Sequence, residues 1–336
     1  MVWDIYAAVR ARMVYAGRLG KNVVEDMLAA GNASDAISYL RETQYYQYIR
    51  NVPAENQELL ELSLYLGLYR SIAPLLAIVD KEYRSIAEHG LLFIENRVIA
   101  SLLISLVMGE TPSLDLKILE GTRLGELYGI VVEDRSLIKA LDYLREKGFA
   151  GLVETYSILS KYIDPRSAIS IASDIGAAKD LSKIVEVEPS LSRLVCPEID
   201  FMLLQSAIRI SRGKAKEYIG SAELSDMACR IGRGEIEDLY SYREEENILN
   251  ILRKIYGTNL IQKSLEESLI NIAGYVKKTV RSSLEAAFSS YPFDPSIVWA
   301  AIRVRIMDIE DIIAIINGKK AGLPIEIIRK IISIAI

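Results

Sequence analysis

AISYLRE at residues 36–42 returns 104 positions later as ALDYLRE at residues 140–146. A second pair of matching segments lies upstream of the first. Arg18-Leu19-Gly20 returns 105 positions later as Arg123-Leu124-Gly125. Two segments that recur in the same order at nearly the same shift indicate an internal repeat. The apolar residues in the longer segment are spaced three and four apart, which is typical of an amphipathic helix.

A third segment occurs three times and extends the repeat to the whole chain. It reads Phe93-Ile94-Glu95-Asn96, then Glu198-Ile199-Asp200-Phe201, then Asp308-Ile309-Glu310-Asp311, at shifts of 105 and 110 positions. We interpret each copy as the start of an apolar helix that ends near a glycine, and these glycines are Gly109, Gly213 and Gly318. Three copies in 336 residues give about 112 residues per unit, which is longer than tetratricopeptide, ankyrin or HEAT repeats of about 33 to 47 residues.

The repeat predicts three similar helical domains. Their bounds are Met1–Leu114, Asp115–Ile219 and Gly220–Ile336, and they are expected to be related by rotations of about 120°. The fold class is all-α, because apolar residues follow helical spacing over long windows and no Asn-Gly or Asp-Gly turn joins alternating segments. Capping residues predict three helix starts, at Ser34, at Asp164 and at Asp294, and the last two precede a proline.

The composition favours a large core and argues against a nucleic-acid partner. The 40 basic and 45 acidic side chains give a net charge of −5, whereas a phosphate-binding face has a basic excess. Hydrophobic residues make up 51% of the chain, and the mean hydropathy is +0.19. The apolar run Val98–Met108 is shorter than the roughly 20 residues that span a bilayer, and Leu62–Val79 is broken by Arg70 and Pro74. We therefore expect a soluble protein without a signal peptide.

The rare residues exclude several kinds of site. His89 is the only histidine, and Cys196 and Cys229 are the only cysteines, so a Cys/His zinc site cannot be assembled. The cysteines lie 33 positions apart and form no C-x-x-C motif. Two thiols in a chain of this length indicate a reducing, cytoplasmic compartment. We interpret His89 as a surface or C-capping residue rather than an acid–base catalyst.

The sequence contains no recognisable nucleotide or nucleophile motif. None of the Gly-Lys pairs, which begin at Gly20, Gly213 and Gly318, has the upstream glycine of a phosphate-binding loop. Gly232-Arg233-Gly234 lacks the third glycine of a dinucleotide fingerprint and is interpreted as a helix boundary. No serine lies in a G-x-S-x-G motif, and neither cysteine has a histidine or basic cluster beside it.

The repeated helical units and two local features resemble a known family. In the first feature, Tyr39-Leu40-Arg41-Glu42-Thr43 is followed by Tyr45-Tyr46. The second is the C-terminal series Asp308-Ile309-Glu310-Asp311-Ile312, Ile315-Ile316-Asn317-Gly318-Lys319 and Gly322-Leu323-Pro324. Over essentially the whole chain, the pattern resembles the C subunit of the archaeal A-type ATP synthase, a relative of the d subunit of the eukaryotic vacuolar ATPase. The chain departs from the family pattern where Phe93 replaces an acid and Phe201 replaces an asparagine.

The resemblance implies a mechanical role. Three helical domains around a pseudo-threefold axis would form a funnel that sits on the membrane proteolipid ring and receives the foot of the central shaft, which is made of the D and F subunits. The chain would be a non-catalytic central-stalk (rotor) subunit, linking proton or sodium transport to ATP synthesis or hydrolysis. No cofactor, metal, nucleotide or nucleic acid is implied. The expected location is the cytoplasmic face of the cell membrane, where the protein would be peripheral.

Three acids are the candidate partner-binding residues: Glu95, Asp200 and Glu310, one at each of the related helix starts. We expect them to line the funnel, and the alternative is that each caps a helix N-terminus within its own domain. Two other functions stay open, a helical scaffold of another assembly and an all-α enzyme. Binding to the shaft and the ring would favour the rotor role over the scaffold, and turnover of a nucleotide or diphosphate by the lone chain would favour the enzyme.

Overall fold

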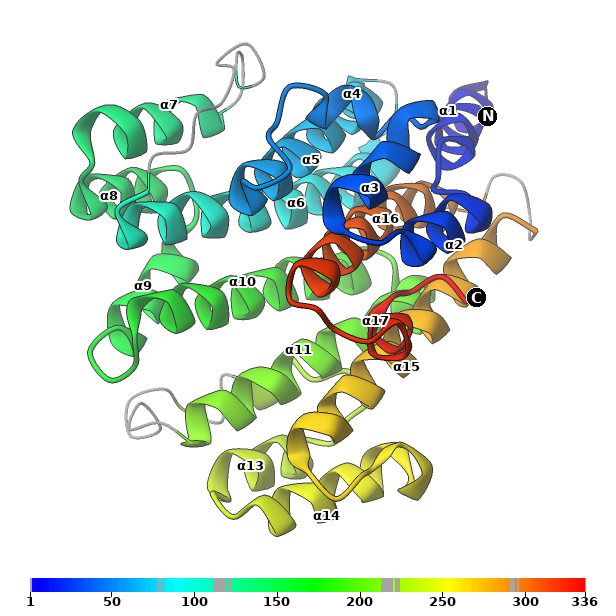
Figure 1. The fold of residues 1–336 in the computed structure, drawn as a ribbon. Helices are drawn as coiled ribbons and strands as arrows, with labels where there is room; N and C mark the ends of the chain where they lie inside the picture. Colours follow the sequence, from blue (N-terminus) through cyan, green and yellow to red (C-terminus); the bar gives the residue numbers. More distant parts are fainter. Residues whose placement is uncertain are drawn as a thin grey trace. The chain divides into compact units, whose positions relative to one another are not determined.

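The computed structural model is an all-α chain, which confirms the predicted fold class (Figure 1). It describes residues 2–77, 79, 81–110, 119, 123–212, 220, 224–289, 294 and 296–335, and no strand occurs among them. The chain divides into two compact units. The first unit combines Met1–Ile94 with Ala273–Ile336, and the second is Glu95–Ile272.

The first unit contains both ends of the chain. Its N-terminal helices are α1 (Val2–Ala16), α2 (Lys21–Ala29), α3 (Ala33–Ser38), α4 (Tyr46–Ile49), α5 (Gln57–Ile72) and the first part of α6 (Lys81–Met108), with 3-10 turns at Tyr39–Glu42 and Ala73–Ala77. Its C-terminal helices are the second part of α15 (Leu265–Ala287), α16 (Ser296–Lys320) and α17 (Ile325–Ile331).

The second unit is one continuous segment. It contains the rest of α6, α7 (Arg123–Gly129), α8 (Leu137–Glu146), α9 (Ala150–Leu159), α10 (Pro165–Val187), α11 (Ser192–Arg212), α13 (Arg233–Ser241), α14 (Glu245–Tyr256) and the start of α15. A π-helical turn at Ile130–Asp134 follows α7, and 3-10 turns lie at Pro189–Leu191 and Thr258–Leu260.

The order of the helices repeats along the chain. Among the described residues, short helices precede a pair of long ones three times. The short helices α2, α3 and α4 precede α5 and α6, the short helices α7, α8 and α9 precede α10 and α11, and α13 and α14 precede α15 and α16. The three-domain division stays a prediction. Its first boundary, Leu114 to Asp115, and the end of its second domain, Ile219, lie outside the described residues, as does the predicted helix end at Gly213.

Capping explains where several helices begin and end. Asp164 accepts the N–H of Ser167 at the start of α10, which confirms this predicted helix start. The prediction for Ser34 is wrong, because Asn32 caps α3 by accepting the N–H of Asp35. Asn32 provides the short side-chain oxygen that such a cap requires, two residues earlier in the sequence. Gly109 directly follows α6 with a φ of 74°, as expected for a glycine at a helix end.

α16 forms the centre of the first unit. Every residue from Ser296 to Ile309 is buried. Helices α1, α3, α5 and α17 all pack against it. Because burying one large apolar side chain contributes roughly 1.5 to 3 kcal/mol, α16 supplies much of the hydrophobic stabilisation of this unit. In the second unit, α10 and α11 pack against each other, and α11 also packs on α13.

In the described part of the chain, two helical segments have the length and hydropathy of a membrane span. They are Gln57–Ala77 and Arg84–Met108, with mean hydropathies of 1.2 and 1.9, and 61% of each apolar window is buried inside the protein. The run noted at Val98–Met108 is therefore the second half of a longer apolar helix. Core helices of soluble proteins also meet these criteria, so length and composition alone do not identify a span.

A glycine allows α15 and α17 to approach closely. A Cβ placed on Gly274 would lie only 1.8 Å from the carbonyl oxygen of Lys330 in α17. Gly151 in α9 is the opposite case, because a Cβ there would meet nothing within 4 Å. The two positions therefore differ in whether a side chain can be accommodated.

Candidate functional site

The three acids singled out in the sequence lie inside long helices. Glu95 lies within α6, Asp200 within α11 and Glu310 within α16, so the prediction that they open helices is wrong. Their alternative role as N-terminal caps of these helices is wrong for the same reason. The apolar runs that follow the acids are the second halves of helices that begin well upstream.

Glu95 is paired with the arginine of a repeated motif. Its side chain is 2% exposed and forms an ion pair with Arg123, whose Nε donates to Oε2 at 2.9 Å. Arg123 is the first residue of the Arg123-Leu124-Gly125 copy of the repeat, and its guanidinium lies 4.8 Å from the ring centroid of Phe149. Glu95 therefore holds the segment at the start of α7.

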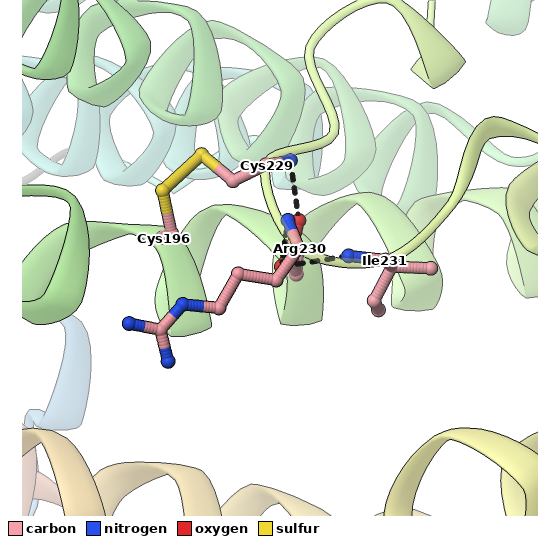
Figure 2. Close-up of a disulfide and its surroundings, with 5 residues drawn as sticks. Cys196, Cys229, Arg230 and Ile231 are labelled. Carbon is pink, nitrogen blue, oxygen red and sulfur yellow. Dashed lines mark hydrogen bonds between the residues drawn. A yellow bond between two sulfur atoms is a disulfide. The ribbon is translucent and has the colours of Figure 1, made fainter.

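Asp200 holds the segment that precedes α13. Its carboxylate accepts the backbone N–H groups of Cys229 at 2.8 Å, Arg230 at 2.9 Å and Ile231 at 3.2 Å (Figure 2). Burial raises the pKa of Asp200 above its ordinary value, although these three N–H donors oppose the rise. Arg230-Ile231-Gly232 follows Arg123-Leu124-Gly125 by 107 positions and is a third copy of the same motif.

The two cysteines form a disulfide beside Asp200. Cys196 in α11 is bonded to Cys229, with a Cα–Cα distance of 5.4 Å, and Figure 2 shows the bond next to Arg230 and Ile231. The prediction of two thiols in a reducing compartment is corrected in this respect. The spacing of 33 positions contained no sign of the bond, because only folding brings Cys229 back to the first part of α11.

Loss of this disulfide should lower the free energy of unfolding by about 3 to 4 kcal/mol, since it closes a loop of 33 positions in the unfolded chain. Urea unfolding of the Cys196→Ala/Cys229→Ala variant should reveal the loss. A reducing agent should lower the free energy of unfolding of the wild type by a similar amount and should leave that of the variant unchanged. An equal response of both proteins to reductant would contradict the prediction.

Glu310 is paired with one basic side chain on its own helix and one on α15. Its side chain is 14% exposed, and it pairs with Arg303 at 3.1 Å and with Lys277 at 3.6 Å. The acid that holds the first motif is Asp308, whose Oδ2 accepts the backbone N–H of Leu19 at 2.8 Å. Asp308 follows Asp200 by 108 positions, close to the spacing of the motifs themselves, so it is the structural counterpart that the sequence comparison missed.

Asp308 belongs to a buried charge network. It forms an ion pair with Arg281 at 2.8 Å and lies 3.9 Å from Arg305, and Tyr45 donates its hydroxyl to it at 2.6 Å. Together with Asp311, the network contains two cations and two anions, all less than 5% exposed. Burial opposes the charge of Arg281, but Asp308 and Asp311 raise its pKa above the ordinary value.

We call each contact between an acid within a long helix and an Arg-Leu-Gly or Arg-Ile-Gly segment a clasp. The three clasps join Glu95 to Arg123, Asp200 to Arg230 and Ile231, and Asp308 to Leu19. The first uses the arginine side chain, and the other two use backbone N–H groups. With the predicted domain bounds, the acid and the motif of each clasp belong to different copies of the repeat.

Asp311 fixes the C-terminal segment of the chain. It accepts the N–H of Ser333 at 2.7 Å, the hydroxyl of Ser333 at 2.7 Å and the N–H of Ile334 at 3.2 Å. Burial raises the pKa of Asp311 to about 6, although Lys277, Arg281 and the Ser333 donors act in the opposite direction.

The raised pKa of Asp311 predicts a pH-dependent stability. Because the folded value lies above the ordinary value of 3.8, the stabilisation from the bound proton is complete only below pH 3.8 and is lost as the pH rises through about 6. The free energy of unfolding of the wild type minus that of Asp311→Asn should fall by about 2 kcal/mol between pH 4 and pH 7. Denaturant titrations at pH 4, 5, 6 and 7 measure it. A difference that stays constant with pH would contradict the assignment.

No catalytic constellation is visible in the described part of the chain. There, no group of three or more histidine, cysteine, aspartate or glutamate side chains is arranged to hold a metal ion. His89 lies inside α6, so its interpretation as a C-capping residue is wrong. The Gly232 boundary is confirmed, since Gly232 is the N-cap residue of α13. The buried acids accept hydrogen bonds from other segments of their own chain and form ion pairs with them.

These features define an all-α protein whose buried carboxylates join one segment of the chain to another. A family model described as the ATP synthase (C/AC39) subunit matches residues 7–331. The chain belongs to this family, which confirms the resemblance found in the sequence. A comparison with curated proteins finds no match.

Family membership gives the chain a role in an ATP synthase of the A/V type. Members of the family are generally non-catalytic, and they assemble with other subunits into a membrane-associated complex. The clasps and the fold therefore belong to a protein that works within an assembly.

Proposed function

We propose that this chain is the central-stalk (rotor) subunit that couples the rotary shaft to the membrane proteolipid ring. Its partners are the D and F subunits of the shaft at one end and the ring at the other. It transmits rotation between ATP synthesis or hydrolysis and proton or sodium transport, as a peripheral protein at the cytoplasmic face of the membrane. It uses no cofactor or nucleotide of its own.

The observation that supports this proposal most is the cyclic order of the three clasps. With the repeats as predicted, Glu95 of the first copy holds the motif of the second, Asp200 of the second holds that of the third, and Asp308 of the third holds that of the first. A closed set of three domains around a pseudo-threefold axis requires this order. A closed collar suits a protein that surrounds the end of a shaft.

The clasps also suit a part that carries torque. Hydrogen bonds to charged groups contribute roughly 1.5 to 3 kcal/mol each, more than neutral ones, and they lose little to solvent when they are buried. Glu95, Asp200 and Asp308 are at most 3% exposed. Each predicted junction between repeats therefore includes at least one strong polar contact that resists sliding.

Removal and readdition of the chain tests the proposal. The rotary complex stripped of this chain should hydrolyse ATP without pumping ions, because the shaft no longer drives the ring. Addition of the purified chain should restore pumping. A stripped complex that pumps at full efficiency would exclude the coupling role.

The assignment of Glu95, Asp200 and Glu310 to the shaft contact stays a prediction. Their internal partners favour a structural role, so charge reversal of all three should lower the thermal stability of the isolated chain. A triple variant that keeps its helical content and stability, yet docks to the shaft more weakly and with stronger salt dependence, would restore the partner-binding assignment.

A further inference from the structure

The N-terminal helix α1 buries small apolar residues and exposes large ones. Ala7, Ala8 and Ala11 are buried, and α1 packs on α16. The large residues Ile5, Tyr6, Val9 and Met13 are each at least 48% exposed. Helices usually bury their large apolar side chains and leave small or polar ones outside. This exposed set, the α1 stripe, is therefore a candidate contact surface.

A recess with a cationic lining lies at the Met13 end of the α1 stripe. It has a volume of about 210 Å³, and its lining includes Arg10, Met13, Gln44, Ser71 and Arg305. Because Arg10 and Met13 belong both to α1 and to this lining, the recess and the stripe form one surface. Arg10 also lies beside the stripe, with its guanidinium 6.0 Å from the ring centroid of Tyr6.

Arg305 leaves one hydrogen-bonding group without a partner. The residue is 1% exposed, its Nε donates to Tyr45 and its Nη1 donates to the Val14 carbonyl oxygen at 3.2 Å. Its Nη2 is buried and has no hydrogen-bond partner among the described residues. Buried polar groups in folded proteins nearly always have a partner. Arg305 also lines the recess, so it adds a second positive charge to a lining that already contains Arg10.

We propose that the α1 stripe and this recess bind an amphipathic helix of a partner protein, which places one carboxylate between Arg10 and Arg305. This inference rests on the proposed function, because the partner is taken to be another protein of the rotary complex. Ile5, Val9 and Met13 are spaced four apart, so they form a ridge that packs into the groove of another helix. A carboxylate matches the fork geometry of a guanidinium and accepts two of its N–H groups.

An anionic membrane surface fits this face less well. Recognition of acidic lipids generally uses clusters of about 4 to 8 lysine and arginine side chains. Of the two arginines of α1, Arg10 lies at the recess, whereas Arg12 donates to the carbonyl oxygen of Phe288 at 3.2 Å. One recess lined by two arginines, Arg10 and Arg305, suits a single carboxylate on a protein segment.

Photocrosslinking in the purified rotary complex tests the proposal. A photoreactive benzoylphenylalanine at Met13 should crosslink to a helical peptide of another protein in the complex that has an aspartate or glutamate within one turn of the crosslinked residue. The same probe at Ile138, an exposed apolar residue of α8, is the matched control and should not capture that peptide. Crosslinks from Met13 only to lipid, or to a second copy of this chain, would overturn the proposal.

Rebinding of purified variants to the stripped complex gives an independent measurement. Arg10→Gln and Val9→Ala/Met13→Ala should each raise the dissociation constant about tenfold, whereas Ile138→Ala should leave it unchanged. Reversing the acid of the crosslinked peptide to arginine should restore affinity for Arg10→Glu. If the wild type itself fails to rebind, the proposed function is wrong. If the wild type and the variants rebind equally, only the α1 inference is overturned.

Discussion

Asp308→Asn should lower the free energy of unfolding by about 3 to 5 kcal/mol, because it removes one charge from a buried network. The variant keeps the shape of the side chain, but Arg281 loses the carboxylate at 2.8 Å and Arg305 loses the one at 3.9 Å. Of the two buried anions only Asp311 then remains, 3.8 Å from Arg281. Uncompensated charge in the interior costs far more than the loss of one hydrogen bond. Urea unfolding followed by circular dichroism at pH 7 measures the effect.

A surface ion pair provides the control for this experiment. Asp142 pairs with Arg145 at 2.9 Å, but both side chains are more than half exposed. Asp142→Asn should therefore produce no measurable change, since solvent screens exposed pairs. If Asp308→Asn is as stable as this control, the Asp308 clasp does not contribute to folding, and the support that it gives to the proposed collar is lost.

Gly274→Ala should destabilise the protein by about 3 kcal/mol or more. The added Cβ would lie 1.8 Å from the Lys330 carbonyl oxygen, and real Cβ atoms are not found within 3.0 Å of a neighbour. Because the obstacle is backbone, α15 and α17 must separate, which adds to the ordinary cost of about 1 to 3 kcal/mol for an overpacked core. Thermal unfolding of the variant measures the change.

Gly151→Ala separates this steric effect from the intrinsic effect of removing a glycine. A Cβ at Gly151 meets nothing, so the substitution should be neutral or stabilise α9 by about 0.4 to 1 kcal/mol. Equal stabilities of the two variants would show that α17 is not packed on Gly274. A melting curve in which only Gly274→Ala loses stability would confirm the close approach.

Local sequence patterns were sufficient for the fold class. The helical spacing of apolar residues is a local property that can be recognised within a few turns of sequence, so it does not require knowledge of tertiary contacts. The Asp164-Pro165 start of α10 was predictable for the same reason. The start of α3 was misplaced by two residues, because Asn32 and Ser34 are both good caps and only the backbone geometry decides between them.

The candidate site was less predictable, because it depends on which helix face meets which segment. Glu310 and Asp308 are two positions apart, which corresponds to a rotation of about 200° around a helix. Glu310 therefore meets Arg303 and Lys277, whereas Asp308 meets Leu19. Aligning the copies by residue type alone selected the wrong acid, although the third motif at Arg230-Ile231-Gly232 would have indicated the register.

The disulfide and the position of the acids show the same limit. Nothing in a spacing of 33 positions distinguishes two free thiols from a bonded pair, since the bond depends on the return of Cys229 to α11. Similarly, a polar residue before an apolar run marks a helix start only if the preceding residues are not helical. In α6 they are helical, so Glu95 is an interior residue.

The discontinuity of the first unit has a consequence for how the chain is made. Leu19 and Asp308 are 289 positions apart, so a ribosome adding about 5 to 20 residues per second completes α16 roughly 15 to 60 s after α1 and α2 have emerged. The second unit is continuous and can fold during that interval. Until then the apolar helix α5 cannot pack against α16, so we expect chaperones to bind the nascent N-terminal segment. A chain truncated before residue 296 would lack α16, the helix against which that segment packs.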